Sequence, residues 1–266
     1  MSSDLTEFVA TLPTQMVIFV AILARVAALL VAFPSFSSQS VPTVVRAATA
    51  VGLTFLLFPL LEKQFFDAHI NDVMDPGRLI VFFCAEFLSG SLIGFLSQLM
   101  ISSFPIGAQM MSTFIGLSNV LQPDPELGAQ STPISHVAEL IVTVVIFSSG
   151  MYVLPLHALV GSYQLFPPGH FPFLGDAARS VTHATQYSFL LAFQLAMPIV
   201  LIGTLWPVML GLLSRFSPGL QIYNLAMPAQ LLGGILLFAL LLKGMLSAWI
   251  HITEAGLGHI PGNGVF

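Results

Sequence analysis

Charged residues are scarce in this chain. Asp, Glu, Lys and Arg make up 7% of its 266 residues, whereas 56% are hydrophobic. A soluble domain usually carries roughly 25% charged residues, so the composition excludes a water-soluble globule. Only seven residues are Lys or Arg and the net charge is −5, which excludes a basic surface for nucleic acid. We therefore expect an all-α integral membrane protein that contacts membrane lipid and binds no nucleic acid.

Cysteine and the common catalytic motifs are also missing. The single cysteine, Cys84, excludes an internal disulfide and a multi-cysteine metal site. The sequence has no His-Glu-x-x-His zinc motif, no phosphate-binding Gly-x-x-x-x-Gly-Lys loop and no Rossmann fingerprint. His136 and Glu139 favour a polar pair at a helix end over half of a metal site. His157 lies near two serines at 148–149, but the Gly-x-Ser-x-Gly elbow of a serine hydrolase is absent, so we expect no catalysis, metal or cofactor.

Long uncharged stretches organise the chain. Residues 87–123, 140–175 and 180–214 are each too long for one membrane-spanning helix, which needs about 20 apolar residues. Proline removes a backbone donor and crowds the preceding turn of a helix. We therefore expect broken or kinked helices at the prolines inside these stretches, namely Pro105, Pro155, Pro198 and Pro207.

Turn signals separate the apolar runs. Proline, glycine and small polar residues cluster at 34–38, 75–77, 122–126 and 166–169. Thr132 is a typical N-cap, and Pro133 after it suits the first position of a helix. The predicted helices cover about 12–33, 43–61, 78–104, 106–118, 134–165, 179–213 and 222–250. They predict five to seven spans, of which six is the most natural number.

Small residues and one charge recur on single faces of two predicted helices. The first face holds Ala21, Arg25, Ala28 and Ala32, and the second holds Glu86, Gly90, Gly94 and Ser97. Small residues let helices approach closely, and an arginine in an apolar run should face protein or water. The patterns favour packing contacts. A pathway-lining role for Arg25 and a proton-carrying role for Glu86 are the alternatives.

Residues 107–118 combine glycines, methionines and an aromatic residue between Pro105 and a Pro-Asp-Pro turn. Methionine fills irregular gaps and adapts to varied partners, so the segment suits a deformable seal. Gly107 and Gly116 bracket it and would give the backbone freedom to move. The residues alone favour core filling over a seal.

Several short motifs are spread over nearly the whole chain. The strongest runs from Leu210 to Tyr223 with the pattern Leu-x-x-Arg-φ-x-Pro-x-Leu, and Met227-Pro228 continues it. The others are Ala24-Arg25-Val26, Pro34-Ser35-Phe36, the run at 41–46, the run at 90–95, Gly116-Leu117-Ser118 and Asp124-Pro125. In content and order these motifs resemble the flagellar type III export-gate family called FliR.

The resemblance implies a non-enzymatic subunit of the flagellar type III protein export gate. Such a subunit assembles with P and Q subunits, and with the B and A export subunits, in the bacterial inner membrane at the flagellar basal body. Unfolded flagellar proteins pass through the resulting channel during flagellum assembly. The resemblance also implies one export-gate domain over residues 1–266, in which about 1–170 are similar to the P subunit and about 171–266 form a Q-like hairpin.

The same resemblance implies functional positions. The segment equivalent to Met110–Gln122 would project into the channel as a plug, sealed by Met110, Met111, Phe114 and Leu117. Assembly or structural roles fall to Arg25, Pro42, Arg46, Glu86, Gly90, Gly94, Arg215, Pro218 and Pro228.

Two other classes of protein stay open at this point. One is the homologous T subunit of virulence-type III secretion systems, which neighbouring genes would distinguish. The other is a small-molecule or proton-coupled transporter, for which Glu86 would be essential.

Overall fold

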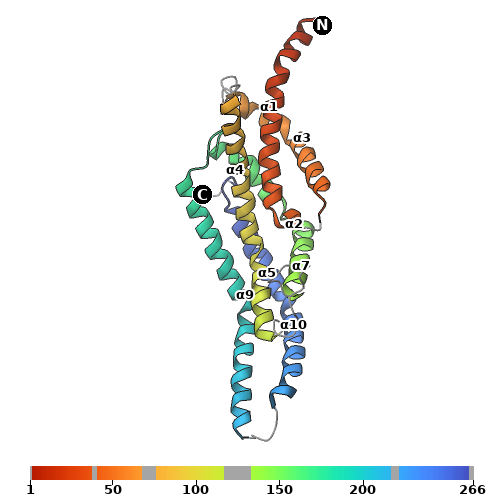
Figure 1. Cartoon of the computed structure of the whole chain (residues 1–266), viewed down its shortest axis with the longest axis vertical. Helices are drawn as coiled ribbons and strands as arrows, with labels where there is room; N and C mark the ends of the chain where they lie inside the picture. Colours follow the sequence, from red (N-terminus) through yellow and green to blue (C-terminus); the bar gives the residue numbers. More distant parts are fainter. Residues whose placement is uncertain (1, 38–40, 68–75, 117–132, 217–221, 264–266) are drawn as a thin grey trace. The chain divides into compact units, whose positions relative to one another are not determined.

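The computed structural model describes residues 2–37, 41–67, 76–116, 133–216 and 222–263. Within these ranges the chain forms helices joined by turns, and no strand. The helices are α1 (Ser2–Ala32), α2 (Pro34–Ser37), α3 (Thr43–Asp67), α4 (Pro76–Ile101), α5 (Ser103–Ile115), α7 (Pro133–Ser149), α8 (Val153–Leu165), α9 (Leu174–Phe216) and α10 (Ile222–Gly258) (Figure 1). The predicted all-α fold is confirmed.

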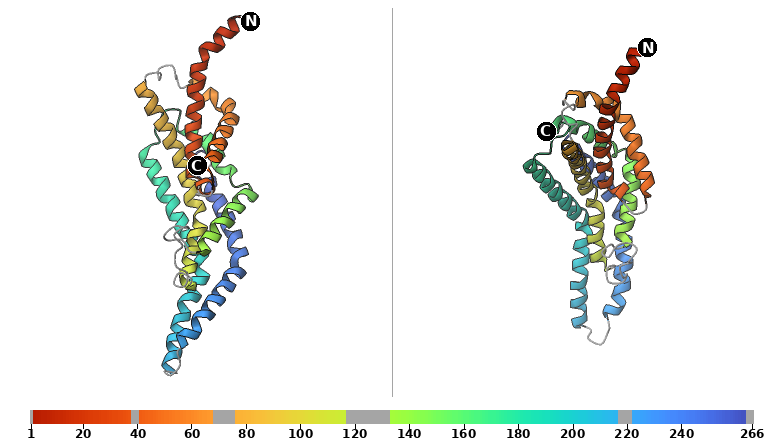
Figure 2. Two further views of the ribbon diagram at one scale, coloured as in Figure 1. Left: turned by 45° about the vertical axis from the view of Figure 1, so that its right-hand side comes forward. Right: turned by 45° about the horizontal axis from the view of Figure 1, so that its top comes forward.

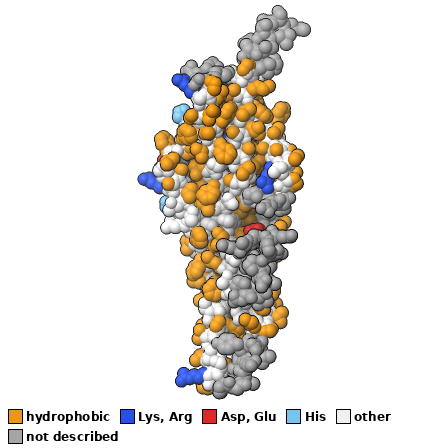
Figure 3. Space-filling view, viewed as in Figure 1, with side chains coloured by type: hydrophobic (Ala, Val, Ile, Leu, Met, Phe, Trp, Pro, Cys, Tyr) orange, Lys and Arg blue, Asp and Glu red, His pale blue; other side chains and the backbone are white. Residues whose placement is uncertain are grey.

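The helices are long and apolar enough for a multi-pass membrane protein. Within the described ranges five helical segments qualify as membrane spans, and a sixth does if α7 and α8 form one bent span. Apolar side chains cover much of the face shown in Figure 3, where Lys and Arg are few. The predicted number of five to seven spans is therefore confirmed.

Two of the four prolines lie just after a helix break. Pro105 and Pro155 each occupy the third position of a helix, where the missing N–H costs nothing. The break expected at Pro155 within 134–165 lies slightly earlier, between α7 and α8, where Gly150 takes a left-handed φ of +77°. In contrast, α9 continues through Pro198 and Pro207 without a break.

The chain divides into two compact units. Unit 1 contains Met1–Leu99, Gly150–Ala184 and Gly256–Phe266, and unit 2 contains Met100–Ser149 and Thr185–Ala255. Each unit is therefore built from segments that are distant in the sequence.

In unit 1, α1 packs along α3, and the two helices lie side by side in both views of Figure 2. Aromatic rings join α3 to α4 and α8. The centroid of the Phe65 ring lies 6.4 Å from that of Phe82 and 5.5 Å from that of Tyr163. These contacts bring α3, α4 and α8 around one core.

In unit 2, α5 is the central helix. It packs against α7 and buries one face through Phe104, Ala108, Met111 and Ile115. The spacing of these residues is that of one helical stripe. Helices α9 and α10 also contact α5, and residues 217–221 between these two helices lie outside the described residues.

Candidate functional site

A buried ion pair joins α1 to α4 in unit 1. The Arg25 Nε donates to Glu86 Oε2 at 2.8 Å, and Arg25 Nη2 donates to Glu86 Oε1 at 3.2 Å. Both side chains are completely buried. This is the bidentate geometry in which a guanidinium and a carboxylate bind most strongly.

Further polar groups complete the network around this pair. The Arg25 guanidinium donates to Ser162 Oγ at 3.0 Å and to the carbonyl of Phe166 at 3.2 Å, and it lies 3.7 Å from the centroid of the Tyr163 ring. The backbone N–H of Gly169 donates to Glu86 Oε1 at 2.9 Å. The network therefore ties α1 and α4 to α8 and to the turn that follows α8.

Glycines allow α1 and α4 to approach closely at the ion pair. A Cβ atom on Gly90 would overlap the Arg25 backbone carbonyl, and one on Gly94 would lie 2.7 Å from the carbonyl oxygen of Leu29. The two small-residue faces seen in the sequence are thus brought against each other. Because Arg25 finds its partners within its own chain, its charge needs no second subunit.

The predicted plug segment begins on α5 in unit 2. Met111 is fully buried in the unit, whereas Met110 and Phe114 are half-buried. Leu117 and the rest of the segment to Gln122 lie outside the described residues. Gly116 ends the helix with a left-handed φ of +89°, which suits glycine.

The first half of α5 is fixed to its neighbours. Trp249 of α10 donates its Nε1–H to Ser103 Oγ at 3.0 Å, and its ring packs edge-on against Phe104. A Cβ atom on Gly107 would lie 3.0 Å from the carbonyl oxygen of Ala192 on α9. Gly107 therefore serves close packing inside a helix, and the expectation that it frees the backbone is wrong.

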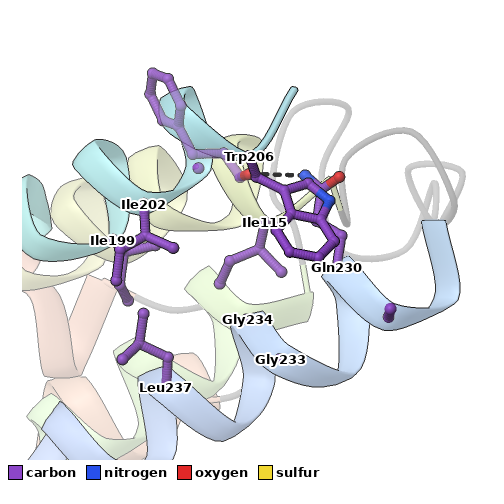
Figure 4. A pocket seen from close by; sticks show the side chains of 11 residues that line it. Ile115, Ile199, Ile202, Trp206, Gln230, Gly233, Gly234 and Leu237 are labelled. Atoms are coloured by element: carbon purple, nitrogen blue, oxygen red, sulfur yellow. Dashed lines mark hydrogen bonds between the residues drawn. The ribbon is translucent and has the colours of Figure 1, made fainter. Parts of the chain in front are cut away.

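A largely apolar cavity of about 290 Å³ lies at the C-terminal end of α5 (Figure 4). Its walls come from α5, α9 and α10 and include Ile115, Ile199, Ile202, Trp206, Gln230 and Leu237. The Gln230 side chain donates its Nε2–H to the carbonyl of Phe114 at 3.2 Å. Gln230 and Trp206 were not predicted from the sequence, where the only signal was a polar residue one turn before Gly234 in an uncharged run.

A model of the family described as "Bacterial export proteins, family 1" matches residues 16–256 of the chain. The chain belongs to this family. The FliR-type resemblance seen in the sequence is confirmed.

Several named proteins are similar in sequence to this chain over most of their own length. The chain is 26% identical to "Flagellar biosynthetic protein FliR" of Caulobacter vibrioides over 88% of its own length and 92% of the relative's. The identity to the protein of that name from Escherichia coli is also 26%, over 83% and 82% of the two chains. "Yop proteins translocation protein T" of Yersinia pestis is 26% identical over 89% and 88%.

The remaining predicted assembly residues of the export protein lie at the ends of helices or outside the described ranges. Pro42 is exposed just before α3, and Arg46 is half-buried in its first turn. Arg215 is exposed in the last turn of α9, and Pro228 lies inside α10 near its start. Pro218 is not among the described residues. Among the predicted assembly residues, the structure brings Arg25, Glu86, Gly90 and Gly94 together.

Two histidines singled out in the sequence, His136 and His157, make polar contacts in the structure. His136 Nδ1 lies 3.7 Å from Glu139 Oε2 on the surface of α7. His157 Nδ1 is 3.1 Å from Asn263 Oδ1, while the two serines at 148–149 each donate to the carbonyl of Val145. Among the described residues, no three His, Cys, Asp or Glu side chains form a group that could hold a metal ion.

Proposed function

We propose that the chain is a non-enzymatic subunit of the flagellar type III protein export gate. With P and Q subunits it would form the inner-membrane channel through which unfolded flagellar proteins pass, at the basal body and next to the B and A export subunits. The family match over residues 16–256, with flagellar relatives similar over at least four fifths of the chain, carries this proposal. Several apolar helices of spanning length support it.

Within this gate we propose a structural role for the ion pair. Both Glu86 oxygens accept hydrogen bonds from Arg25 or Gly169, which is the arrangement of a paired carboxylate. A proton carrier in a transporter would need a carboxylate that exchanges partners during a cycle. The bidentate geometry therefore supports the export-gate proposal over a proton-coupled transporter.

We also propose that Met110–Gln122 closes the resting channel. A secretion channel must hold back ions and still admit an unfolded chain of any sequence. Apolar side chains seal by excluding water and can rearrange without demanding particular partners. Met110 and Phe114, half-buried on the last turns of α5, and Leu117 after them would supply this seal.

The plug proposal is tested with alanine at Met110, Met111, Phe114 and Leu117 in a complex co-expressed with P and Q subunits. The complex should assemble and leak small ions or dye across the inner membrane. Deleting Met110–Leu117 should also leak, but it removes helical residues of α5 as well. Met111→Ala alone separates sealing from packing at this position, because Met111 is buried in unit 2 and its loss can act through stability. An assembled four-alanine complex as tight as the wild type would place the seal elsewhere.

We also propose that the chain has a P-like part and a Q-like part. Residues 1–170 would take the place of a P-like subunit, and residues 171–266, which include α9 and α10, would form a Q-like hairpin. Pro42, Arg46, Arg215, Pro218 and Pro228 would contact companion subunits. Co-purification with P and Q subunits tests this arrangement, and a long-lived monodisperse monomer would contradict it.

A T subunit of a virulence-type system is the second candidate. It is favoured by the similarity to the Yersinia translocation protein, which extends over 89% of the chain. Complementation separates the two functions. Restored motility in a flagellar mutant lacking its own R subunit supports the flagellar proposal, and restored secretion only in an injectisome mutant supports the alternative.

A further inference from the structure

The last turn of α5 is held between α9 and α10. A Cβ atom on Gly203 of α9 would lie 2.8 Å from the backbone oxygen of Phe114. A Cβ atom on Gly234 of α10 would lie 2.8 Å from Ile115 Cγ1 and 3.0 Å from its Cβ. Neither glycine has room for a methyl group, so both are needed for the close approach.

One side chain adds a polar contact to this packing. The carbonyl of Phe114 belongs to the last turn of a helix, where carbonyls lack intrahelical donors. Gln230 of α10 donates to it at 3.2 Å, as the dashed line in Figure 4 shows. The Gln230 amide also flanks Gly116, since a Cβ atom there would lie 3.5 Å from Gln230 Nε2. Gln230 therefore contacts the helix end at the residue where the chain leaves α5.

The surroundings of the helix end leave space for movement. The cavity of about 290 Å³ adjoins Phe114 and Ile115, and almost all of its wall is apolar. The first half of α5, in contrast, is fixed by Trp249 and by the Gly107–Ala192 contact. A displacement of the last turn would therefore break one hydrogen bond and two glycine contacts while Ser103–Gly107 stay in place.

We propose that Gly203, Gln230 and Gly234 form a latch that holds the C-terminal turn of α5 and regulates the plug. In this inference, which rests on the proposed plug function, the α9–α10 pair sets where the plug segment starts. Opening the channel requires the turn to leave the latch. The three residues are positioning residues, since they act on the plug through Phe114 and Ile115.

The first experiment weakens the latch in the full complex and measures dye leakage. Gln230→Met keeps the side-chain length and removes the donor. Loss of one net hydrogen bond of about 1 kcal/mol changes a two-state population about fivefold, so leakage should rise about fivefold. Gly234→Ala should also leak, because its methyl group displaces Ile115.

Gly233→Ala is the matched control. Gly233 is adjacent on the same helix and lines the same cavity, yet a Cβ atom there meets nothing within 4 Å. It should stay as tight as the wild type, and Ile115→Ala should rescue Gly234→Ala by removing the overlapping atoms. Equal leakage of assembled Gly233→Ala and Gly234→Ala complexes would overturn the latch.

The second experiment locks the latch. Ile115→Cys and Gly234→Cys are combined with Cys84→Ser. A Cβ atom at Gly234 would lie 3.0 Å from that of Ile115, so the two Cβ atoms need to move apart only slightly to reach the separation of about 3.5–4.5 Å found in disulfides. Oxidation should cross-link the pair and stop export of flagellar proteins, and reduction should restore it. No cross-link, or normal export by a fully cross-linked complex, would overturn the latch.

The two proposals fail in different ways. If the four-alanine plug variant does not leak while the cross-link still blocks export, the plug is wrong and α5 acts on the channel by another surface. If the plug variant leaks while the cross-linked complex exports normally, the plug stands and the latch is wrong.

Discussion

Unit 1 joins its helices through a buried ion pair, whereas unit 2 holds α5 through glycines and one neutral amide. In unit 1 the guanidinium of Arg25 and the carboxylate of Glu86 are fully buried. Separating α1 from α4 would therefore leave two unpaired charges in an apolar interior. In unit 2, moving the end of α5 breaks a single neutral hydrogen bond from Gln230. The charged contact therefore suits a fixed scaffold, and the neutral contact suits a part that moves.

Removing one partner of the ion pair should break the scaffold. Glu86→Leu leaves Arg25 buried without its counter-charge, which costs about 3–5 kcal/mol. The variant should be depleted from membranes and should not co-purify with P and Q subunits.

Glu86→Gln is the control for that variant. Its amide oxygen can accept from Arg25 Nη2 and from the Gly169 backbone, as Glu86 Oε1 does. Only the hydrogen bond from Arg25 Nε to Oε2 is lost, so assembly and export should be largely kept. Loss of export in a fully assembled Glu86→Gln complex would make proton coupling through Glu86 the better explanation.

A methyl group at the α1–α4 contact should have the next largest effect. The Cβ atom of Gly90→Ala would overlap the Arg25 carbonyl, and because backbone cannot rotate away, the helices must separate at a cost of about 1–3 kcal/mol. Protein abundance in the membrane and resistance to thermal aggregation in detergent measure this loss. Gly52→Ala on α3 is the matched control, since a Cβ atom there meets nothing within 4 Å. Equal behaviour of the two variants would show that α1 and α4 do not need this close contact.

The smallest effect should come from the exposed arginine of unit 2. Arg215, in the last turn of α9, is exposed where Arg25 is buried. Its guanidinium offers five donors to a neighbouring subunit. Arg215→Ala should leave the abundance of the chain unchanged while reducing co-purification with P and Q subunits and swarming motility. Normal assembly and swarming would remove Arg215 from the assembly residues.

Much of the helical pattern could be predicted from the sequence because it depends on residues that are close together in the chain. Uncharged runs and proline-containing turns gave the positions of the helices, and Pro133 is indeed the first residue of α7. A break was expected at Pro155, but its position at Gly150 was missed, because glycine inside an apolar run is common in membrane helices and does not reveal its φ angle. Only the fold shows that this glycine is left-handed.

The contacts of the sites were less predictable, because periodicity defines a face but not what packs on it. The faces of Arg25 and Glu86 were visible in the sequence, yet their pairing spans 61 residues and the bond to Ser162 spans 137. In α5 the methionines were predicted as seal residues, although Met111 lies in the core of unit 2. The residues that contact the end of the helix are Gln230, Gly203 and Gly234. An isolated glutamine in an uncharged run carries no local sign of its partner.

The long sequence separation within the ion pair has a consequence for biogenesis. Translation delivers α1 to the membrane first. Glu86 follows Arg25 by 61 positions, which takes roughly 3–12 s at about 5–20 residues per second. During that interval the nascent helix carries an uncompensated arginine, which costs roughly 2.5–3.5 kcal/mol at the centre of the bilayer. Because α4 follows α1 in the chain, the ion pair that compensates Arg25 can form only after α4 has been synthesised.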